Sequence, residues 1–400
     1  MKPFQRTQDV NMIDKKIFAL SLTAHRTSHM FIFNTIGGAK IHPNKILTVS
    51  PKMEILARNL TGDSEETQYC FPNLQGSCLR SQKLIFIKVA MYICMAFIIL
   101  MTVCGNLLVI ISISHFRQLH SPTNLIILSL AFIDWFLGTF LMPCSMIRSV
   151  EDCWYFGETF CKIHSSIDIM MSAASLLHLG LISVDRYLAI CKPLQYRTSV
   201  TMHKVAALIG ITWMFSFAFG FGVILSKVNL VGVEELFINS CTGTCILFFN
   251  KEGGMMAAFV AFFIPGSVMI ALYMKIFYVA KVQARKINCS LAMTRARCDK
   301  KCTSEHTDRK AAKTLAIVLG VFLLCWLPFS MVLVLDPFFD YSTPAVVFDA
   351  LGWLGCFNST CNPLIYGLFY PWFRRAFKII LSGKVFQNGS SLLNIYVERN

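Results

Sequence analysis

Charged residues are scarce in this chain of 400 residues, where Asp, Glu, Lys and Arg make up 15% against 55% hydrophobic residues. Water-soluble proteins contain about a quarter charged residues, so this balance disfavours a soluble enzyme. The 16 cysteines are diluted over the whole length, which excludes a small disulfide scaffold. The 34 Phe and 19 Met bring too much apolar bulk for a disordered chain. A membrane protein with several spans remains.

Seven long apolar runs follow the first eighty residues, approximately at 84–114, 122–148, 159–190, 204–226, 254–280, 312–335 and 345–369. About 20 residues in a helix are long enough to cross the hydrocarbon core of a bilayer. Within lipid every backbone amide must be hydrogen-bonded inside its own segment, so these runs are predicted to be helices. The predicted fold class is all-α, a bundle of seven transmembrane helices.

Basic residues beside the runs predict the orientation, because Lys and Arg next to a span are retained on the cytoplasmic side. The segment 281–313 carries ten basic and three acidic residues, whereas the connection between the sixth and seventh runs has acids and no Lys or Arg. We therefore expect a plasma-membrane protein with its amino terminus outside the cell and its carboxyl terminus inside. The net charge of +15 then reflects topology and not nucleic-acid binding.

Three regions are predicted, namely an extracellular amino-terminal segment at 1–80, the helix bundle at 81–370, and a cytoplasmic tail at 371–400. The tail is expected to begin with a short amphipathic helix, Pro371 to Leu381, on the lipid surface. Residues 1–52 are expected to be disordered or an upstream extension of the reading frame that begins at Met53. Asn59, in an Asn-Leu-Thr sequence, is a predicted glycosylation site.

Two acidic residues, Asp134 and Asp168, lie well inside the apolar runs and away from their ends, where an ionised side chain costs about 2.5–3.5 kcal/mol. Asp168 follows Cys161 by two helical turns, or about 10 Å, a depth that a small ligand can reach from outside. No Lys or Arg is expected at a comparable depth in the other six runs. We therefore expect Asp168 to be the counter-ion of a bound cation and not half of an ion pair within the protein.

A second polar cluster is expected in the middle of the membrane around Asp134, together with Asn106, Asn358 and Asn362. Two interpretations have equal weight. The cluster could bind a sodium ion with water, or it could be a hydrogen-bonded structural network without an ion. No other cofactor is predicted.

Asp185-Arg186-Tyr187 stands at the inner end of the third run. Arg186 is predicted to pair with Asp185 and with Asp308 at the foot of the sixth run, which would hold the inner face closed. Alternatively, Arg186 extends to the lipid headgroups. Four prolines interrupt spans and provide joints for a change of shape, although lipid packing also explains them: Pro143, Pro265, Pro328 and Pro363.

Six cysteines are predicted to lie outside the cell, and they permit fifteen complete pairings: Cys70, Cys78, Cys153, Cys161, Cys241 and Cys245. Cysteines within the runs, such as Cys325, are expected to be small buried residues. The spacing of Cys and His indicates no zinc site, and no nucleophile with a base, phosphate loop or set of metal ligands was found. The chain is therefore predicted to be neither a metalloprotein nor an enzyme.

Motifs in all seven runs resemble those of rhodopsin-like G-protein-coupled receptors in order and place, over about residues 80–385. They are Gly105-Asn106, 128–134, Asp185-Arg186-Tyr187, Trp213, Pro265 with Tyr273, Phe322-x-x-Cys325-Trp326-x-Pro328, and Asn362-Pro363-Leu364-Ile365-Tyr366. The segment 358–373, which continues past the end of the last run, resembles the fingerprint of the trace amine-associated receptors within that superfamily. Cys153-Trp154-Tyr155-Phe156-Gly157 and the Cys70 to Cys78 segment support this resemblance.

The resemblance implies a function and a set of site residues. Asp168 would bind an amine, with Trp326, Phe329 and Trp353 as aromatic neighbours, and disulfides would join Cys161 to Cys245 and Cys78 to Cys241. The implied partners are an amine, a stimulatory G protein that raises cyclic AMP, arrestin and membrane lipid. The implied activation switch consists of Asp185, Arg186, Tyr187, Tyr273, Asp308, Pro328, Pro363 and Tyr366.

Departures from the amine-receptor pattern narrow the expected ligand. Catechol-binding serines are replaced on the fifth run by Ala257, Ala258 and Ala261, and Ala258 also lacks the second acid by which some relatives hold diamines. Cys356 and Ser330 replace a tyrosine and an aromatic residue of the usual amine cage. We expect a volatile or aromatic monoamine. The alternatives are another aminergic or a peptide receptor, or a transporter, which the odd number of spans and the lack of repeats disfavour.

Overall fold

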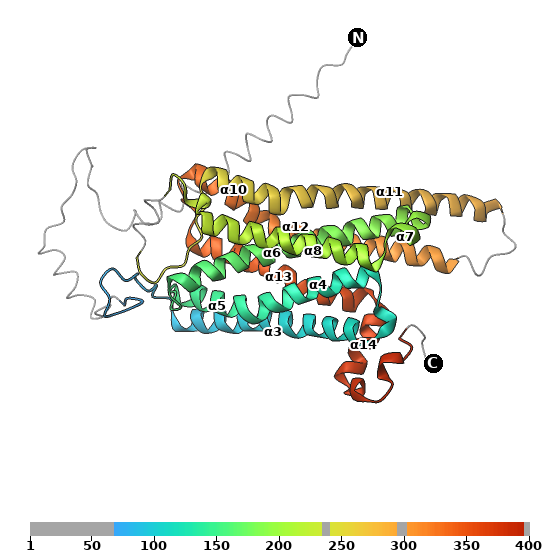
Figure 1. Ribbon diagram of the computed structural model, residues 1–400, viewed down its shortest axis with the longest axis horizontal. Coiled ribbons are helices and arrows are strands. Elements are labelled where there is room, and N and C mark those ends of the chain that lie inside the picture. Colours follow the sequence, from blue (N-terminus) through green and yellow to red (C-terminus); the bar gives the residue numbers. More distant parts are fainter. Residues whose placement is uncertain (1–67, 234–240, 294–301, 396–400) are drawn as a thin grey trace, which may run out of the picture. The chain divides into compact units, whose positions relative to one another are not determined.

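The computed structural model describes residues 68–233, 241–293 and 302–395 (Figure 1). The chain divides into two units, Met1–Glu66 and Thr67–Asn400, and the described residues all belong to the second. The expectations for residues 1–52 and for glycosylation at Asn59 therefore lie outside the described residues. The three predicted regions stay predictions.

Seven long helical stretches run side by side and confirm the predicted bundle (Figure 1). They are α3 (Ile85–His115); α4 (Pro122–Phe136) with η2 (Leu137–Leu141) and α5 (Met142–Glu151); α6 (Glu158–Cys191); α8 (Met202–Ser226); α10 (Lys251–Ala258) with η4 (Phe259–Phe263) and α11 (Ile264–Met293); α12 (Cys302–Leu335); and α13 (Ala345–Phe369). Shorter helices are α7 (Pro193–Ser199) and α14 (Pro371–Leu381), and α14 has the bounds predicted for the amphipathic helix.

Six of these stretches are long and apolar enough to cross a membrane by length and composition, among the residues described. The seventh, α13, is as long as α8, since each contains 25 residues. It falls short on composition because Asp349, Asn358 and Asn362 interrupt its apolar sequence. Polar residues in a membrane helix are tolerated where they face the inside of the bundle. Asn358 and Asn362 are accordingly buried.

Several helix starts follow from local sequence. The side chain of Ser121 accepts a hydrogen bond from Asn124 N before α4, and Asn250 does the same for Gly253 N before α10. Such caps satisfy amides that have no partner within the helix. The fifth and sixth helices are longer than predicted, because α11 continues to Met293 and α12 begins at Cys302. A hydrophobic run marks only the lipid-facing part, whereas Ala, Lys and Arg continue a helix into water.

Two stretches contain a π-helical turn shortly before a proline. η2 ends two residues before Pro143, and η4 ends two residues before Pro265. Proline has no N–H, and its ring crowds the preceding turn. A π turn contains an extra residue, which relieves the crowding. Pro328 and Pro363 instead lie inside the continuous helices α12 and α13.

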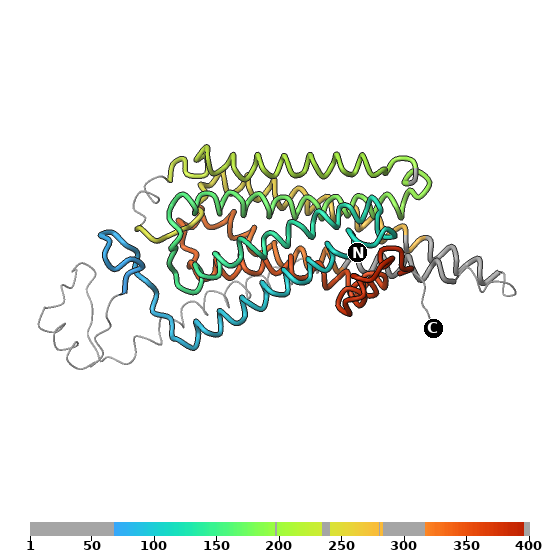
Figure 2. Tube along the Cα trace, turned by 60° about the horizontal axis from the view of Figure 1, so that its bottom comes forward, coloured from blue at the N-terminus to red at the C-terminus, as the bar shows by residue number. Residues whose placement is uncertain are grey.

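The chain after α14 folds back beside the end of α3 (Figure 2). Gly383 and Gly389 turn it with φ angles of 71° and 79°, in the left-handed region that glycine adopts most easily. Ser390 Oγ lies 2.9 Å from His115 Nε2, and Ile395 is 1% exposed within the main apolar core. This part of the tail therefore belongs to the packed fold.

Candidate ligand-binding site

Three disulfides gather at one end of the bundle, which we call the disulfide end. They are Cys161–Cys245, Cys78–Cys241 and Cys70–Cys153. The first two are the pairs that the resemblance implied. The third was not predicted, although Cys70 and Cys153 are the two cysteines left over once those pairs are made. Cys70–Cys153 and Cys78–Cys241 join the segment before α3 to the connection between α5 and α6 and to the connection between α8 and α10. Cys161–Cys245 joins the latter connection to α6.

Ionic contacts reinforce the same end. The Glu151 carboxylate, at the end of α5, accepts hydrogen bonds from Arg80, from Lys88 at 3.0 Å and from the Tyr92 hydroxyl at 3.1 Å. The bond to Glu151 raises the pKa of the Arg80 guanidinium. These contacts hold the first turns of α3 and the segment before it against α5.

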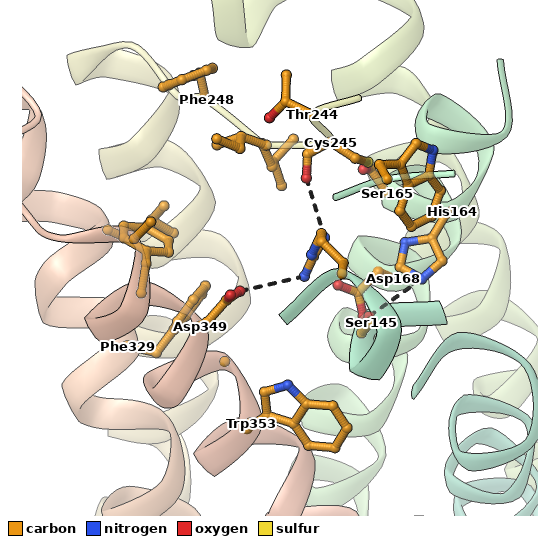
Figure 3. Close-up of a pocket in the computed structure, with 18 of the residues that line it drawn as sticks. Ser145, His164, Ser165, Asp168, Thr244, Cys245, Phe248, Phe329, Asp349 and Trp353 are labelled. Carbon is orange, nitrogen blue, oxygen red and sulfur yellow. Dashed lines mark hydrogen bonds and ion pairs between the residues drawn. The ribbon is translucent and has the colours of Figure 1, made fainter. Parts of the chain in front are cut away.

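A cavity of about 380 Å³ opens below the disulfide end, which is within the size range of small-molecule sites. Its walls come from α5, α6 and α13, with Phe329 of α12 and the segment Gly243 to Phe249 that follows Cys241 (Figure 3). The Cys161–Cys245 disulfide ties this segment to the top of α6. A short loop is thereby held as the roof of the cavity.

Four carboxylates line the cavity: Asp152, Asp168, Asp336 and Asp349. Asp152 pairs with Lys83 Nζ at 2.7 Å. Asp336 Oδ1 accepts from a backbone amide, Thr343 N, at 2.9 Å. Asp349 pairs with an arginine, as described below. Within the described part of the chain, Asp168 alone among the four has no hydrogen bond or ion pair.

Arg148 corrects one expectation. It lines the same cavity as Asp168, so the prediction that no Lys or Arg lies at a comparable depth in the other six runs was wrong. His164, on α6 like Asp168, also lines the cavity. Arg148 stood at the end of the second apolar run, where the sequence suggested the membrane surface. The helix continues to Glu151, and Arg148 lies over the cavity. Neither base forms an ion pair with Asp168 among the residues described.

Arg148 joins three parts of the cavity wall. Its Nη2 lies 3.8 Å from Asp349 Oδ1, and its Nη1 lies 3.4 Å from the carbonyl oxygen of Cys245 (Figure 3). Beside this pair, Trp353 Nε1 donates to Ser149 Oγ at 3.2 Å. Two adjacent contacts thus link α5 to α13.

The predicted ligand-binding residues divide into two groups. Asp168, Phe329, Trp353 and Cys356 line the cavity, but Trp326 and Ala258 do not. Ala258 is 2% exposed and packs within the bundle. The Trp326 ring packs edge-on to Phe329, and a Cβ placed on Gly355 would lie 3.1 Å from it. The predicted residues of the third and seventh helices thus line the cavity, whereas of those predicted on the fifth and sixth helices only Phe329 does.

The polar cluster predicted around Asp134 is present in the core. Asn362 Nδ2 donates to Asp134 Oδ2 at 2.7 Å, and Asn106 Nδ2 donates to the carbonyl of Ser359 at 3.1 Å. Asp134 Oδ1, Asn106 Oδ1 and Asn358 Oδ1 are buried with no hydrogen-bond partner among the described residues. Unpaired buried acceptors are costly in a protein interior. They fit a cation or ordered water.

At the opposite end of the bundle, Arg186 Nη2 lies 2.6 Å from Asp185 Oδ2 and also contacts the Thr123 hydroxyl. The Tyr196 hydroxyl donates to Asp185 Oδ1 at 2.8 Å, which the sequence did not predict. The side chain of Asp308 lies outside the described residues, so its predicted pair with Arg186 stays a prediction.

The other predicted switch residues lie between these two ends. The Tyr273 hydroxyl is 2.8 Å from Ser183 Oγ, which links α11 to α6. Tyr366 is buried in the same core, and Tyr187 packs against it. The pair of Tyr273 with Ser183 is a contact that only the fold reveals, because the two residues are 90 positions apart.

Residues 105–366 match the family described as 7 transmembrane receptor (rhodopsin family). The chain therefore belongs to the rhodopsin family of seven-transmembrane, G-protein-coupled receptors. It is a receptor and not an enzyme. Membership of this family also sets aside the transporter alternative.

Comparison with curated proteins narrows the family further. The chain is 47% identical to trace amine-associated receptor 4 of Rattus norvegicus, over 83% of this chain and 96% of the relative. It is 49% identical to trace amine-associated receptor 2 of Mus musculus, over 84% and 97%. It is 45% identical to trace amine-associated receptor 1 of Homo sapiens, over 82% and 98%. Within the rhodopsin family, it is a member of the trace amine-associated receptors.

Proposed function

We propose that this protein is a plasma-membrane receptor for trace or volatile monoamines, with Asp168 as the counter-ion of the ligand's ammonium group. One observation carries the proposal. Of the four carboxylates that line the cavity, Asp168 is the one without a partner among the described residues. An unpaired carboxylate half-buried among membrane helices is costly, and a protonated amine removes that cost. The relatives are named trace amine-associated receptors, which supports the same ligand class.

The cavity supplies both charge and apolar contact for such a ligand. An ammonium at Asp168 forms a charge-assisted hydrogen bond in a site with little water. Phe329 and Trp353 line the same cavity and offer ring faces, each worth about 0.5–2 kcal/mol to a nearby cation. A small monoamine with an aromatic or alkyl body matches this combination. A ligand held by several peptide groups finds fewer partners, because most of the lining is apolar.

We infer the orientation from the disulfide end, which lies outside the cell because disulfides persist in oxidising surroundings. The ligand then enters from the extracellular side. The end that holds Asp185 and Arg186 faces the cytosol. The receptor is proposed to couple to a stimulatory G protein and afterwards to bind arrestin at that end.

Signal transfer is proposed to be a shift between two arrangements of the bundle. In the arrangement described, Arg186 is bound to Asp185 and Thr123. An agonist that binds another arrangement better would favour release of Arg186, with Pro328 and Pro363 as joints in α12 and α13. The opened end would then accept a helix of the G protein.

The proposal is tested by expressing the full chain in cells with a cyclic AMP reporter and applying a panel of monoamines. A rise in cyclic AMP with one or more of them is expected, together with no response in cells that lack the receptor. If the receptor is present at the cell surface and no monoamine raises cyclic AMP, the proposed ligand class or the proposed coupling is wrong. Recruitment of other G proteins by the same amines would separate those two outcomes.

A sodium ion at Asp134 is part of the proposal, supported by the three unpartnered acceptors around it. An ion that binds only the folded receptor raises its stability. We therefore expect sodium to raise the melting temperature of the purified receptor by a few degrees relative to choline at equal ionic strength. Asp134→Asn is expected to remove this difference. Equal melting temperatures in both salts would favour the structural network without an ion.

A further inference from the structure

Arg148 is the one arginine that lines the ligand cavity in the part of the chain described, and it faces a second carboxylate. Asp168 stands on α6 and Asp349 on α13, so the cavity has an acid on each of two walls (Figure 3). Two acids on facing walls could hold the two ammonium groups of a diamine. Arg148 prevents this arrangement, because it pairs with Asp349 and leaves Asp168 as the free acid of the two.

The contact between Arg148 and Asp349 is loose. The atoms are 3.8 Å apart, and the two side chains are 29% and 33% exposed. Ion pairs with this much exposure contribute about 0–1 kcal/mol to stability. The pair therefore contributes little to holding the helices together. What it does is place a permanent positive charge beside Asp349, since an arginine is not deprotonated in proteins.

The position of that charge is built into the wall. The Cys245 carbonyl accepts from Arg148, and the Cys161–Cys245 disulfide anchors this carbonyl to the top of α6. The neighbouring contact of Ser149 with Trp353 links α5 to α13 without Arg148. Replacing Arg148 should therefore remove a charge from the cavity while the walls stay in place.

We propose that Arg148 is a specificity-determining residue that restricts the receptor to ligands with one ammonium group. It neutralises Asp349 and repels a second ammonium, so that a diamine would bring two positive charges to one free carboxylate. Repulsion between charges of the same sign is an efficient way to exclude a close chemical analogue of the true ligand. This inference rests on the proposed amine function, since it requires the first ammonium to bind Asp168.

The test compares n-hexylamine with hexane-α,ω-diamine, which differ only in the second ammonium, on the full receptor with a cyclic AMP reporter. Arg148→Gln is expected to lower the concentration of diamine needed for half-maximal response by at least about tenfold. The n-hexylamine response should change by a smaller factor, so the ratio of the two half-maximal concentrations is the readout. On the Arg148→Gln receptor, the potency of diamines from diaminobutane to diaminooctane should be highest at one chain length, because the two ammonium groups must reach Asp168 and Asp349 at once.

Two further variants isolate the charge. Arg148→Lys keeps a cation at the position and should gain no diamine response. Asp349→Asn combined with Arg148→Gln should remove the gained response. A gain in both the Gln and the Lys variants, or no gain in a well-expressed Arg148→Gln receptor, would overturn the inference. An n-hexylamine response that persists when Asp168 is replaced would instead contradict the proposed function.

A measurement on the unaltered receptor covers the case in which Arg148→Gln does not reach the cell surface. The monoacetylated derivative of hexane-α,ω-diamine keeps the chain but has a single ammonium. We expect the unaltered receptor to respond to this derivative at a concentration at least about tenfold lower than to the diamine itself. Equal responses to the two compounds would exclude a filter against the second charge.

Discussion

Replacing Asp168 with asparagine is expected to abolish the response to every monoamine that activates the unaltered receptor. The variant keeps the shape of the side chain and removes its charge. A carboxylate and an ammonium about 4 Å apart attract each other by about 4 kcal/mol at an effective dielectric constant of about 20. Losing that attraction weakens binding by about a thousandfold. Cyclic AMP dose–response curves, read beside the surface expression of each receptor, measure the effect.

Asp349→Asn is the matched control for this experiment, because it removes a charge of the same sign from another wall of the same cavity. Asp349 already has Arg148 as a partner, so its loss should leave monoamine responses within a few-fold of the unaltered receptor. Undiminished amine responses in a well-expressed Asp168→Asn receptor would show that the ammonium binds elsewhere. A similar loss in both variants would point to a general electrostatic effect of the cavity.

Gly220→Ala is expected to lower the amount of folded receptor. A Cβ at this position of α8 would lie 2.5 Å from the carbonyl oxygen of Ser166 and 2.8 Å from Met170 N, both on α6. These are backbone atoms, which cannot rotate away. Overpacking of this kind costs about 1–3 kcal/mol. We expect a lower melting temperature of the purified receptor and reduced expression at the cell surface.

Gly222→Ala on the same helix provides the control. A Cβ there meets nothing within 4 Å, so the substitution should be neutral or slightly stabilising because alanine favours a helix. The two variants therefore have opposite expected signs for the same added methyl group. Equal stability of both variants would mean that α6 and α8 do not approach each other as described. Since Asp168 lies between Ser166 and Met170 in α6, any displacement caused by Gly220→Ala should also weaken amine responses.

The helix bundle could be predicted from the sequence because lipid allows few alternatives. A run of apolar residues long enough to cross a membrane has to be helical, so the positions of the seven helices followed from the positions of the apolar runs. Where water replaces lipid, that constraint ends. This explains why the extensions of α11 to Met293 and of α12 from Cys302 were missed. Helix continuation there depends on propensity, which is a weaker signal than hydropathy.

The location of the cavity could not be predicted in the same way. Asp168 was identified because an acid in an apolar run is costly, and that cost is visible in one segment of sequence. Whether Trp326 or Trp353 reaches the same cavity depends on how α12 and α13 are rotated about their axes. Arg148 was overlooked because its position at the end of a run suggests the membrane surface. Its true direction depends on the path of α5 over the cavity and on the loop that Cys245 anchors.

The π turn η2 has a consequence for how the cavity tolerates changes in chain length. Each residue of a helix advances the direction of the next side chain by about 100°. A π turn uses one residue more than a regular turn for the same rotation. Deleting one residue from Leu137–Leu141 would convert the wide turn to a regular one, and Ser145 and Arg148 would still face the cavity. The same deletion in the regular helix between Met142 and Ser145 would turn both side chains away from it. The π turn can thus lose one residue without changing which side chains of α5 line the cavity.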